Sequence, residues 1–186
     1  PDYHMANRPF FDTIEMKGGG DAVSAARAVI QTGEYDFAWN IQVEDEVLQR
    51  LEKGGKGKAL FAVGGDIEFI AINFTDPNTE IDGERSSIKT KHPILSDPRV
   101  RQALALLVDR ESIKKAIYGR AGRATANYLN GPEEFVSKNT KWEFSIEKAA
   151  ALLDQAGWKA GSDGIREKDG KKLKLLYQTS INGPRQ

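Results

Sequence analysis

The apolar positions between residues 97 and 122 follow a helical period and predict two short helices in tandem. One face of the first helix holds the residues that recur at spacings of three and four: Val100, Ala103, Leu104, Leu107 and Val108. Asp97 is a candidate N-cap, and Pro98 stands at the first helical position, where its missing N–H costs nothing. Asp109 can cap the second helix, Gly119 and Gly122 can end it, and its inward side would hold Ile113, Ala116 and Ile117.

Three further stretches carry the same period, so helices are predicted at about 21–31, 43–53 and 145–156. Asp21 and Ser145 can cap the first and the last of them. The residues expected to face inward are Val23, Ala26, Val29 and Ile30 in the first, Val47, Leu48 and Leu51 in the second, and Ala149, Ala150, Leu152, Leu153 and Ala156 in the last.

Four stretches rich in β-branched and aromatic residues predict strands at 10–17, 34–40, 58–63 and 67–74. A hairpin is predicted from 165 to 178, because the dipeptide Asp169-Gly170 suits a type I′ turn between two strands. The polar stretch 75–91 is predicted to be a loop. Helices and strands together predict an α/β fold.

Composition excludes several classes of protein. The 186 residues hold 27 Lys and Arg against 27 Asp and Glu, without the basic excess that a nucleic-acid-binding protein normally shows. No apolar run approaches the roughly 20 residues of a membrane span. Without cysteine there are no disulfides or thiol nucleophiles. The chain opens PDYHMANRPF, which has no signal-peptide pattern and suggests a processed or truncated product.

The residues that carry catalysis or bind cofactors are scarce. His4 and His92 stand alone, without the spacing of a metal site. Gly57-Lys58 is followed by Ala59, which breaks the phosphate-loop pattern, and there is no GxGxxG or GxSxG motif. We therefore expect no enzyme, no catalytic residue, no metal and no cofactor.

A set of motifs carries a family resemblance over nearly the whole chain. These are DPRVRQAL at 97–104 with VDRESI and GRAGRATA after it, AVIQTGEYD at 28–36, and SIEKAAALLDQAGW at 145–158. Together they resemble the extracytoplasmic solute-binding proteins of ABC importers, in the peptide/dipeptide/nickel-binding family (family 5). His4 stands where that family often has tryptophan, which is a departure from the pattern.

The resemblance implies an architecture. It implies a periplasmic-binding-protein-like lobe of type II, similar to dipeptide-binding proteins, with a mixed sheet and packed helices. Residues 1–36 would be the end of a first lobe. Residues 37–186 would be a large part of the second lobe, incomplete at its C-terminus.

The resemblance also implies a function. The expected protein is a monomeric substrate-binding component, periplasmic or extracellular, that captures an extended peptide or similar solute between two lobes. It would deliver the solute to ABC permease subunits in the membrane. A nickel complex, heme or oligosaccharide remains open as the solute.

Ligand contacts are implied at three pairs of residues: Trp39 and Asn40, Gly65 and Asp66, and Asn182 and Arg185. An indole offers a flat apolar wall, and an amide both donates and accepts hydrogen bonds. The backbone at Gly65 and Asp66 would pair with an extended peptide as with an added strand. The arginine could hold a carboxylate through two parallel hydrogen bonds. The alternatives are a core tryptophan, an ordinary turn and an exposed arginine.

Four charged residues of the family motif are predicted to serve architecture instead of ligand binding: Arg99, Arg101, Asp109 and Arg110. They stand where helices begin, and their side chains can reach carboxylates or exposed carbonyls. Two other classes of protein remain as alternatives. One is a stand-alone interaction domain that docks partners through loops 75–91 and 120–144, and the other is an enzyme with a buried acid pair.

Overall fold

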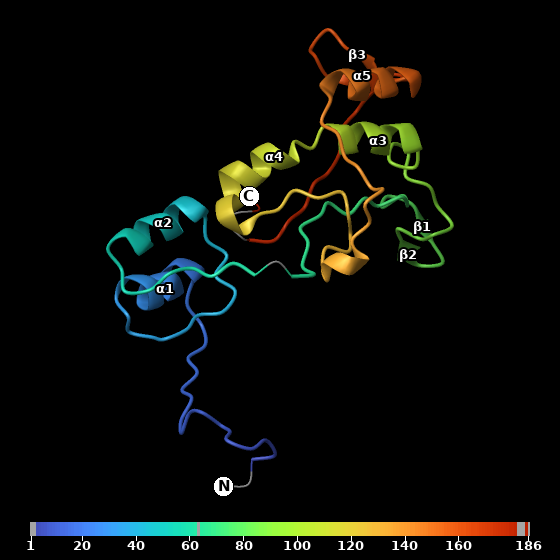
Figure 1. The fold of residues 1–186 in the computed structure, drawn as a ribbon. Helices are drawn as coiled ribbons and strands as arrows, with labels where there is room; N and C mark the ends of the chain where they lie inside the picture. Colours follow the sequence, from blue (N-terminus) through green and yellow to red (C-terminus); the bar gives the residue numbers. More distant parts are fainter. Residues whose placement is uncertain (1–2, 63, 182–184, 186) are drawn as a thin grey trace. The chain divides into compact units, whose positions relative to one another are not determined.

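The structure, a computed structural model, describes residues 3–62, 64–181 and 185 and divides into two compact units (Figure 1). The first unit comprises Pro1–Val43 and Val47–Ala59, and the second comprises Glu44–Glu46 and Leu60–Gln186. The predicted lobe boundary after residue 36 is a different division, and it stays a prediction. None of the described helices has the length and apolar character needed to cross a membrane.

The first unit is built on two helical segments. Helix α1 (Ala22–Ala26) continues as the π-helical η1 (Arg27–Gln31), and α2 spans Asp45–Lys53, of which the part from Val47 onward belongs to this unit. Asp21 caps α1 as predicted, accepting a hydrogen bond from the Ser24 N–H at 2.9 Å. The core of this unit consists of Ala26, Ile30, Val43, Leu48 and Leu51. The predicted helices are thus confirmed, and so are most of their inward-facing residues, but the predicted burial of Val23 is wrong, since this residue is exposed.

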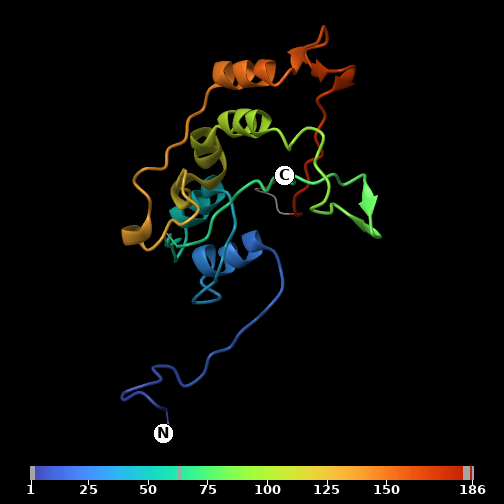
Figure 2. The same cartoon turned by 90° about the vertical axis from the view of Figure 1, so that its right-hand side faces the viewer.

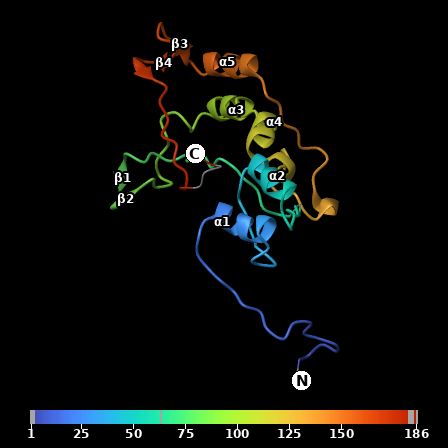
Figure 3. The same cartoon turned by 90° about the vertical axis from the view of Figure 1, so that its left-hand side faces the viewer.

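The second unit is centred on the packing of α3 (Pro98–Leu106) against α5 (Ile146–Gln155), which lie side by side in all three views (Figures 1 to 3). Their caps are Asp97 and Ser145, as predicted. Small residues let the two helices approach closely, and Trp158 closes one end of the interface. The core cluster is Val100, Ala103, Ala149, Leu153, Ala156 and Trp158.

After α3 the chain turns through short helical pieces: α4 (Arg110–Ile113), the π-helical η2 (Lys114–Tyr118) and the 3-10 turn η3 (Gly119–Ala121), with another 3-10 turn, η4, at Glu133–Phe135. Asp109 caps α4 as predicted. The predicted burial is wrong for Leu107 and Ile113, which are 42% and 41% exposed, and for Ala116, which is also exposed. Because α3 ends at Leu106, the residues beyond it leave the face that packs on α5.

Two small antiparallel sheets complete the second unit. One pairs β1 (Glu80–Ile81) with β2 (Glu84–Arg85), and the other has the order β3 (Lys159–Ala160), β4 (Arg166–Lys168), β5 (Lys171–Lys172). The turn between β4 and β5 has positive φ at Asp169 and Gly170, 51° and 72°, as a type I′ turn requires. The predicted hairpin is confirmed, although β5 is shorter than expected.

The four other predicted strands, at 10–17, 34–40, 58–63 and 67–74, are not strands in the described part of the chain. A strand exists only where a run of its backbone N–H and C=O groups pairs with a neighbouring strand, and none of these segments forms such a run there. The His92 N–H donates to the Phe74 carbonyl at 2.7 Å, but a single bond does not make a strand. They leave many large apolar side chains exposed, among them Phe10, Met16, Leu60 and Phe69. The α/β class is confirmed by the combination of helices and sheets, although the sheets that form are small.

Candidate ligand-binding site

The predicted pair Trp39 and Asn40 lies in the first unit, on an extended segment between η1 and α2. The Trp39 side chain is 82% exposed, so it takes no part in the core of that unit. Asn40 has φ of 55°, in the left-handed region that asparagine tolerates better than most residues. The local chemistry is therefore an accessible indole next to an accessible amide.

The other described residues of the predicted set, Gly65, Asp66 and Arg185, lie in the second unit. Residues 64–69, here called the 64–69 segment, meet chain from distant parts of the sequence. A Cβ added at Gly131 would lie 3.4 Å from the Gly64 carbonyl oxygen, so the two backbones pass close together. The rings of Phe69 and Tyr128 have centroids 6.2 Å apart. Gly65 and Asp66 are exposed at this crossing.

Arg185 binds the same segment through an ion pair with Glu68. Its Nε donates to Glu68 Oε2 at 3.0 Å, its Nη2 donates to the other carboxylate oxygen, and its Nη1 donates to Ser180 Oγ at 3.2 Å. The hydrogen bond with Glu68 raises the pKa of Arg185. The carboxylate that binds this guanidinium therefore belongs to the protein itself. Asn182 lies outside the described residues.

Sequence reasoning did not find Glu68, because nothing local marks a contact between residues that are 117 positions apart. Tyr118 belongs to the same neighbourhood. Burial raises the pKa of its phenol, and the Glu68 carboxylate raises it further, while the Arg185 charge opposes both effects. The 64–69 segment thus carries a glutamate whose charge is neutralised by Arg185, beside tyrosine rings and exposed backbone.

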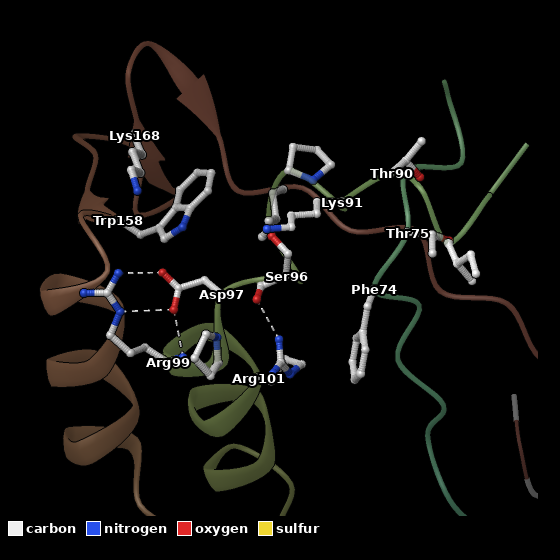
Figure 4. Close-up of a pocket in the computed structure, with 14 residues that line it drawn as sticks. Phe74, Thr75, Thr90, Lys91, Ser96, Asp97, Arg99, Arg101, Trp158 and Lys168 are labelled. Atoms are coloured by element: carbon white, nitrogen blue, oxygen red, sulfur yellow. Dashed lines mark hydrogen bonds and ion pairs between the residues drawn. The ribbon is translucent and has the colours of Figure 1, made fainter. Parts of the chain in front are cut away.

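A shallow pocket of about 960 Å³ lies at the start of α3, with Trp158, Lys168 and Phe74 among the residues that line it (Figure 4). Several of its polar groups bind other parts of the protein. Arg99 pairs with Asp97 and donates to the Gln155 carbonyl at 2.7 Å, and Lys168 donates to the Ala156 carbonyl at 2.8 Å. The first of these carbonyl bonds ties the start of α3 to the end of α5, and the second ties β4 to the same helix end.

Arg101 has a similar role, since it donates to the carbonyls of Leu95 and Ser96 and its guanidinium lies 4.4 Å from the centre of the Phe74 ring. Arg110 lies over the ring of Trp142, and the Asp109 carboxylate accepts from the Ser112 N–H. These contacts confirm the architectural interpretation for Arg99, Arg101 and Asp109. The Arg110 guanidinium contacts the Trp142 ring and reaches neither a carboxylate nor a carbonyl among the described residues, so its architectural role stays a prediction.

Replacing Asp97 by alanine should destabilise the second unit by about 1–2 kcal/mol, since it removes both the N-cap of α3 and the partner of Arg99. Asp97→Asn keeps a capping oxygen and loses the charge, so its effect should be smaller. Urea unfolding followed by circular dichroism measures both. Equal stability of the alanine variant and the wild type would contradict this role of the cap.

The same carboxylate should make stability depend on pH. Hydrogen bonding to Arg99 lowers the pKa of Asp97 to about 2, against an ordinary value near 3.8. The folded state therefore binds this proton less readily than the unfolded chain, so the contribution is complete above about pH 4 and is lost between about pH 4 and 2. Asp97→Asn should flatten that part of the curve of unfolding free energy against pH.

The described residues include no group of three or more His, Cys, Asp and Glu side chains that could hold a metal ion. His92 acts instead as a local acceptor. Its Nδ1 takes hydrogen bonds from the N–H groups of Ile94 and Leu95, both at 3.0 Å, and so shapes the turn before α3.

Several known proteins are similar to the chain in sequence. The oligopeptide-binding protein AppA of Bacillus subtilis is 30% identical over 96% of this chain, and OppA of Lactococcus lactis subsp. cremoris is 27% identical over 96%. The chain spans about 30% of the length of these relatives.

Among solved structures, NikZ of Campylobacter jejuni with Ni(L-His) superposes with a TM-score of 0.40 and 38% identity, over 44% of this chain and 17% of that one. The oligopeptide-binding protein of Thermus thermophilus with a pentapeptide gives 0.38 and 32%, over 42% of this chain and 14% of that one. Residues 1–186 match the family model for the middle part of the bacterial extracellular solute-binding proteins, family 5. The chain therefore belongs to family 5 of the bacterial extracellular solute-binding proteins.

Proposed function

We propose that this chain is part of the substrate-binding component of an ABC importer, and that its substrate is an oligopeptide or a similar extended solute. Family membership and the relatives named as oligopeptide-binding proteins support this function. Such a component captures and releases its solute without chemistry, in the space outside the cytoplasm. We propose that it acts as a monomer, as the resemblance implies.

The proposed mechanism is closure of two lobes on the solute, with residues 1–36 in the first lobe and residues 37–186 in the second. Ligand binding shifts the population toward the closed form only by as much as the ligand makes better contacts in that form. The closed form would then be presented to permease subunits in the membrane. This chain would supply part of the wall around the solute.

The observation that carries the proposed ligand role is the exposure of Trp39. A large indole that is 82% exposed has contributed little to the core of its own unit, so its apolar surface is available for a ligand. An extended peptide offers apolar side chains to the ring and backbone groups to the amide of Asn40. In the same proposal, Gly65 and Asp66 supply exposed backbone to the peptide, and Asn182 supplies polar contacts.

Arg185 has a narrower role in this proposal than the sequence alone suggests. Its guanidinium already holds Glu68, so a simple anion that approaches Arg185 also meets the negative charge of the Glu68 carboxylate. A ligand with both an ammonium and a carboxylate group can instead bind the pair as it stands. This favours zwitterionic solutes such as peptides over simple anions.

Replacing Trp39 by alanine should weaken peptide binding about tenfold, which corresponds to about 1.4 kcal/mol. Isothermal titration of the purified protein with the peptides that it retains measures this change. Trp39→Phe keeps a flat apolar ring and should retain most of the affinity. Because the side chain is exposed, the melting temperature of both variants should match the wild type. Unchanged affinity in Trp39→Ala would remove Trp39 from the proposed site.

A further inference from the structure

A second surface of the second unit has the features of a docking site. A shallow groove of about 880 Å³ runs between α3, α5 and residues 141–143, and we call it the Trp142 groove. Ala105 of α3 and Ala151 of α5 contribute small apolar side chains to it, and Trp142 contributes a half-buried indole. The two helices that line it lie side by side (Figures 1 and 3) and share a core cluster that includes Val100, Ala103 and Leu153.

Some of the charged side chains in the groove form ion pairs and others do not. Lys148 donates to both carboxylate oxygens of Glu143, at 2.7 and 2.8 Å, so these two residues neutralise each other. Arg110 and Lys141 also line the groove, and neither forms an ion pair with any carboxylate in the described ranges. The groove is therefore positively charged next to an aromatic ring.

Arg110 is held in place without a carboxylate. Its guanidinium carbon lies 5.3 Å from the centre of the Trp142 ring, within the range of a cation–π contact. This contact orients the guanidinium while leaving its N–H donors available for an acceptor. An arginine placed in this way loses less conformational entropy when it binds an anion than a freely moving one.

The shape of the groove decides between kinds of occupant. Small-molecule sites are concave and bury most of their ligand, whereas this groove is shallow and rests on two rigid helices. A shallow surface lined by an arginine and a tryptophan has residue types that are enriched in protein-binding surfaces. The charge requires that the partner present a carboxylate, and the indole and alanines require an apolar side chain beside it.

We propose that the Trp142 groove docks a protein segment that presents an acidic side chain next to an apolar one. The inference rests on the proposed function, in which the partner is the extracytoplasmic face of the membrane subunits of the transporter. Arg110 and Lys141 pair with the acidic side chain, and Trp142 packs on its apolar neighbour. Charge pairing at such a surface speeds association and selects the partner.

The test uses the whole ligand-binding protein and its transporter in nanodiscs, with docking followed by surface plasmon resonance at low and high salt. The variant Arg110→Glu/Lys141→Glu should dock at least tenfold more weakly, because it sets like charges against each other. A glutamate at position 110 is compatible with folding, since it falls in the first turn of α4, where negative charge is favourable. Arg110→Gln/Lys141→Gln removes the charges without reversing them.

The matched control is Lys171→Glu/Lys174→Glu, which reverses two exposed charges of the same unit outside the groove. It should dock within about twofold of the wild type. Wild-type docking should weaken as salt rises, and the neutral groove variant should lose most of that dependence. Peptide affinity, measured by titration, and melting temperature should be unchanged in all variants.

Groove variants that dock like the wild type, or wild-type docking that does not respond to salt, would overturn the inference. The proposed function fails by a different measurement, namely the absence of peptide binding by the wild-type protein. A wild-type protein that binds peptide but does not dock on the transporter overturns the inference together with permease delivery.

Discussion

Replacing Trp158 by alanine should destabilise the second unit by about 3–5 kcal/mol, the usual cost of removing a large aromatic side chain from a core. Trp158 is only 6% exposed and packs in the cluster formed by α3 and α5. Small residues surround it, among them Ala103 and Ala156, and they cannot move far enough to fill the space. A marginally stable unit would lose much of its stability.

The chain provides a matched control, because Trp39 is the same residue type at an exposed position. Trp39→Ala should change the free energy of unfolding by less than about 0.5 kcal/mol. Urea unfolding should be followed by far-ultraviolet circular dichroism, since both changes remove a fluorophore. Similar losses in the two variants would contradict the assignment of Trp158 to the core.

Replacing Gly55 by alanine should destabilise the first unit by about 1–3 kcal/mol. A Cβ at this position would lie 2.2 Å from the Ile30 carbonyl oxygen and 2.6 Å from the Leu51 carbonyl oxygen. Both are backbone atoms within the unit, so relief requires movement of helix ends. The same Ile30 carbonyl accepts hydrogen bonds from the N–H groups of Lys56 and Gly57, at 2.7 and 3.0 Å, and a shift would weaken both.

Gly54 is the control for this substitution, since it precedes Gly55 and a Cβ there would meet nothing within 4 Å. Gly54→Ala should leave stability within about 0.5 kcal/mol of the wild type. Hydrogen exchange at the amides of Lys56 and Gly57 reports the local change directly. Protection that survives in Gly55→Ala would show that the close approach to Ile30 does not constrain the fold.

The local parts of the fold were predictable because their causes are local. A cap such as Asp97 or Ser145 lies within three residues of the N–H group that it satisfies, and the inward face of a helix repeats within a few turns. The Asp169-Gly170 turn is fixed by which residues tolerate positive φ. These features were found from neighbours in the sequence alone.

The strands and the site were harder to predict, because their causes are not local. A segment such as 67–74 has strand-like composition, but composition does not supply the neighbour that its backbone needs. The Glu68–Arg185 pair joins residues far apart in the sequence, and no local pattern predicts it. The sequence could not show whether Trp39 is exposed or buried in the core, because an aromatic residue is found in either environment.

The most direct test of the proposed function is native mass spectrometry of the protein as its cell makes it, purified without denaturation from outside the cytoplasm. The proposal predicts a population of bound peptides, one for each monomer, that Trp39→Ala retains less well. A single bound metal complex or sugar would assign the solute to another class. A protein that carries no ligand in repeated mild preparations, and whose melting temperature no peptide raises, would contradict the account.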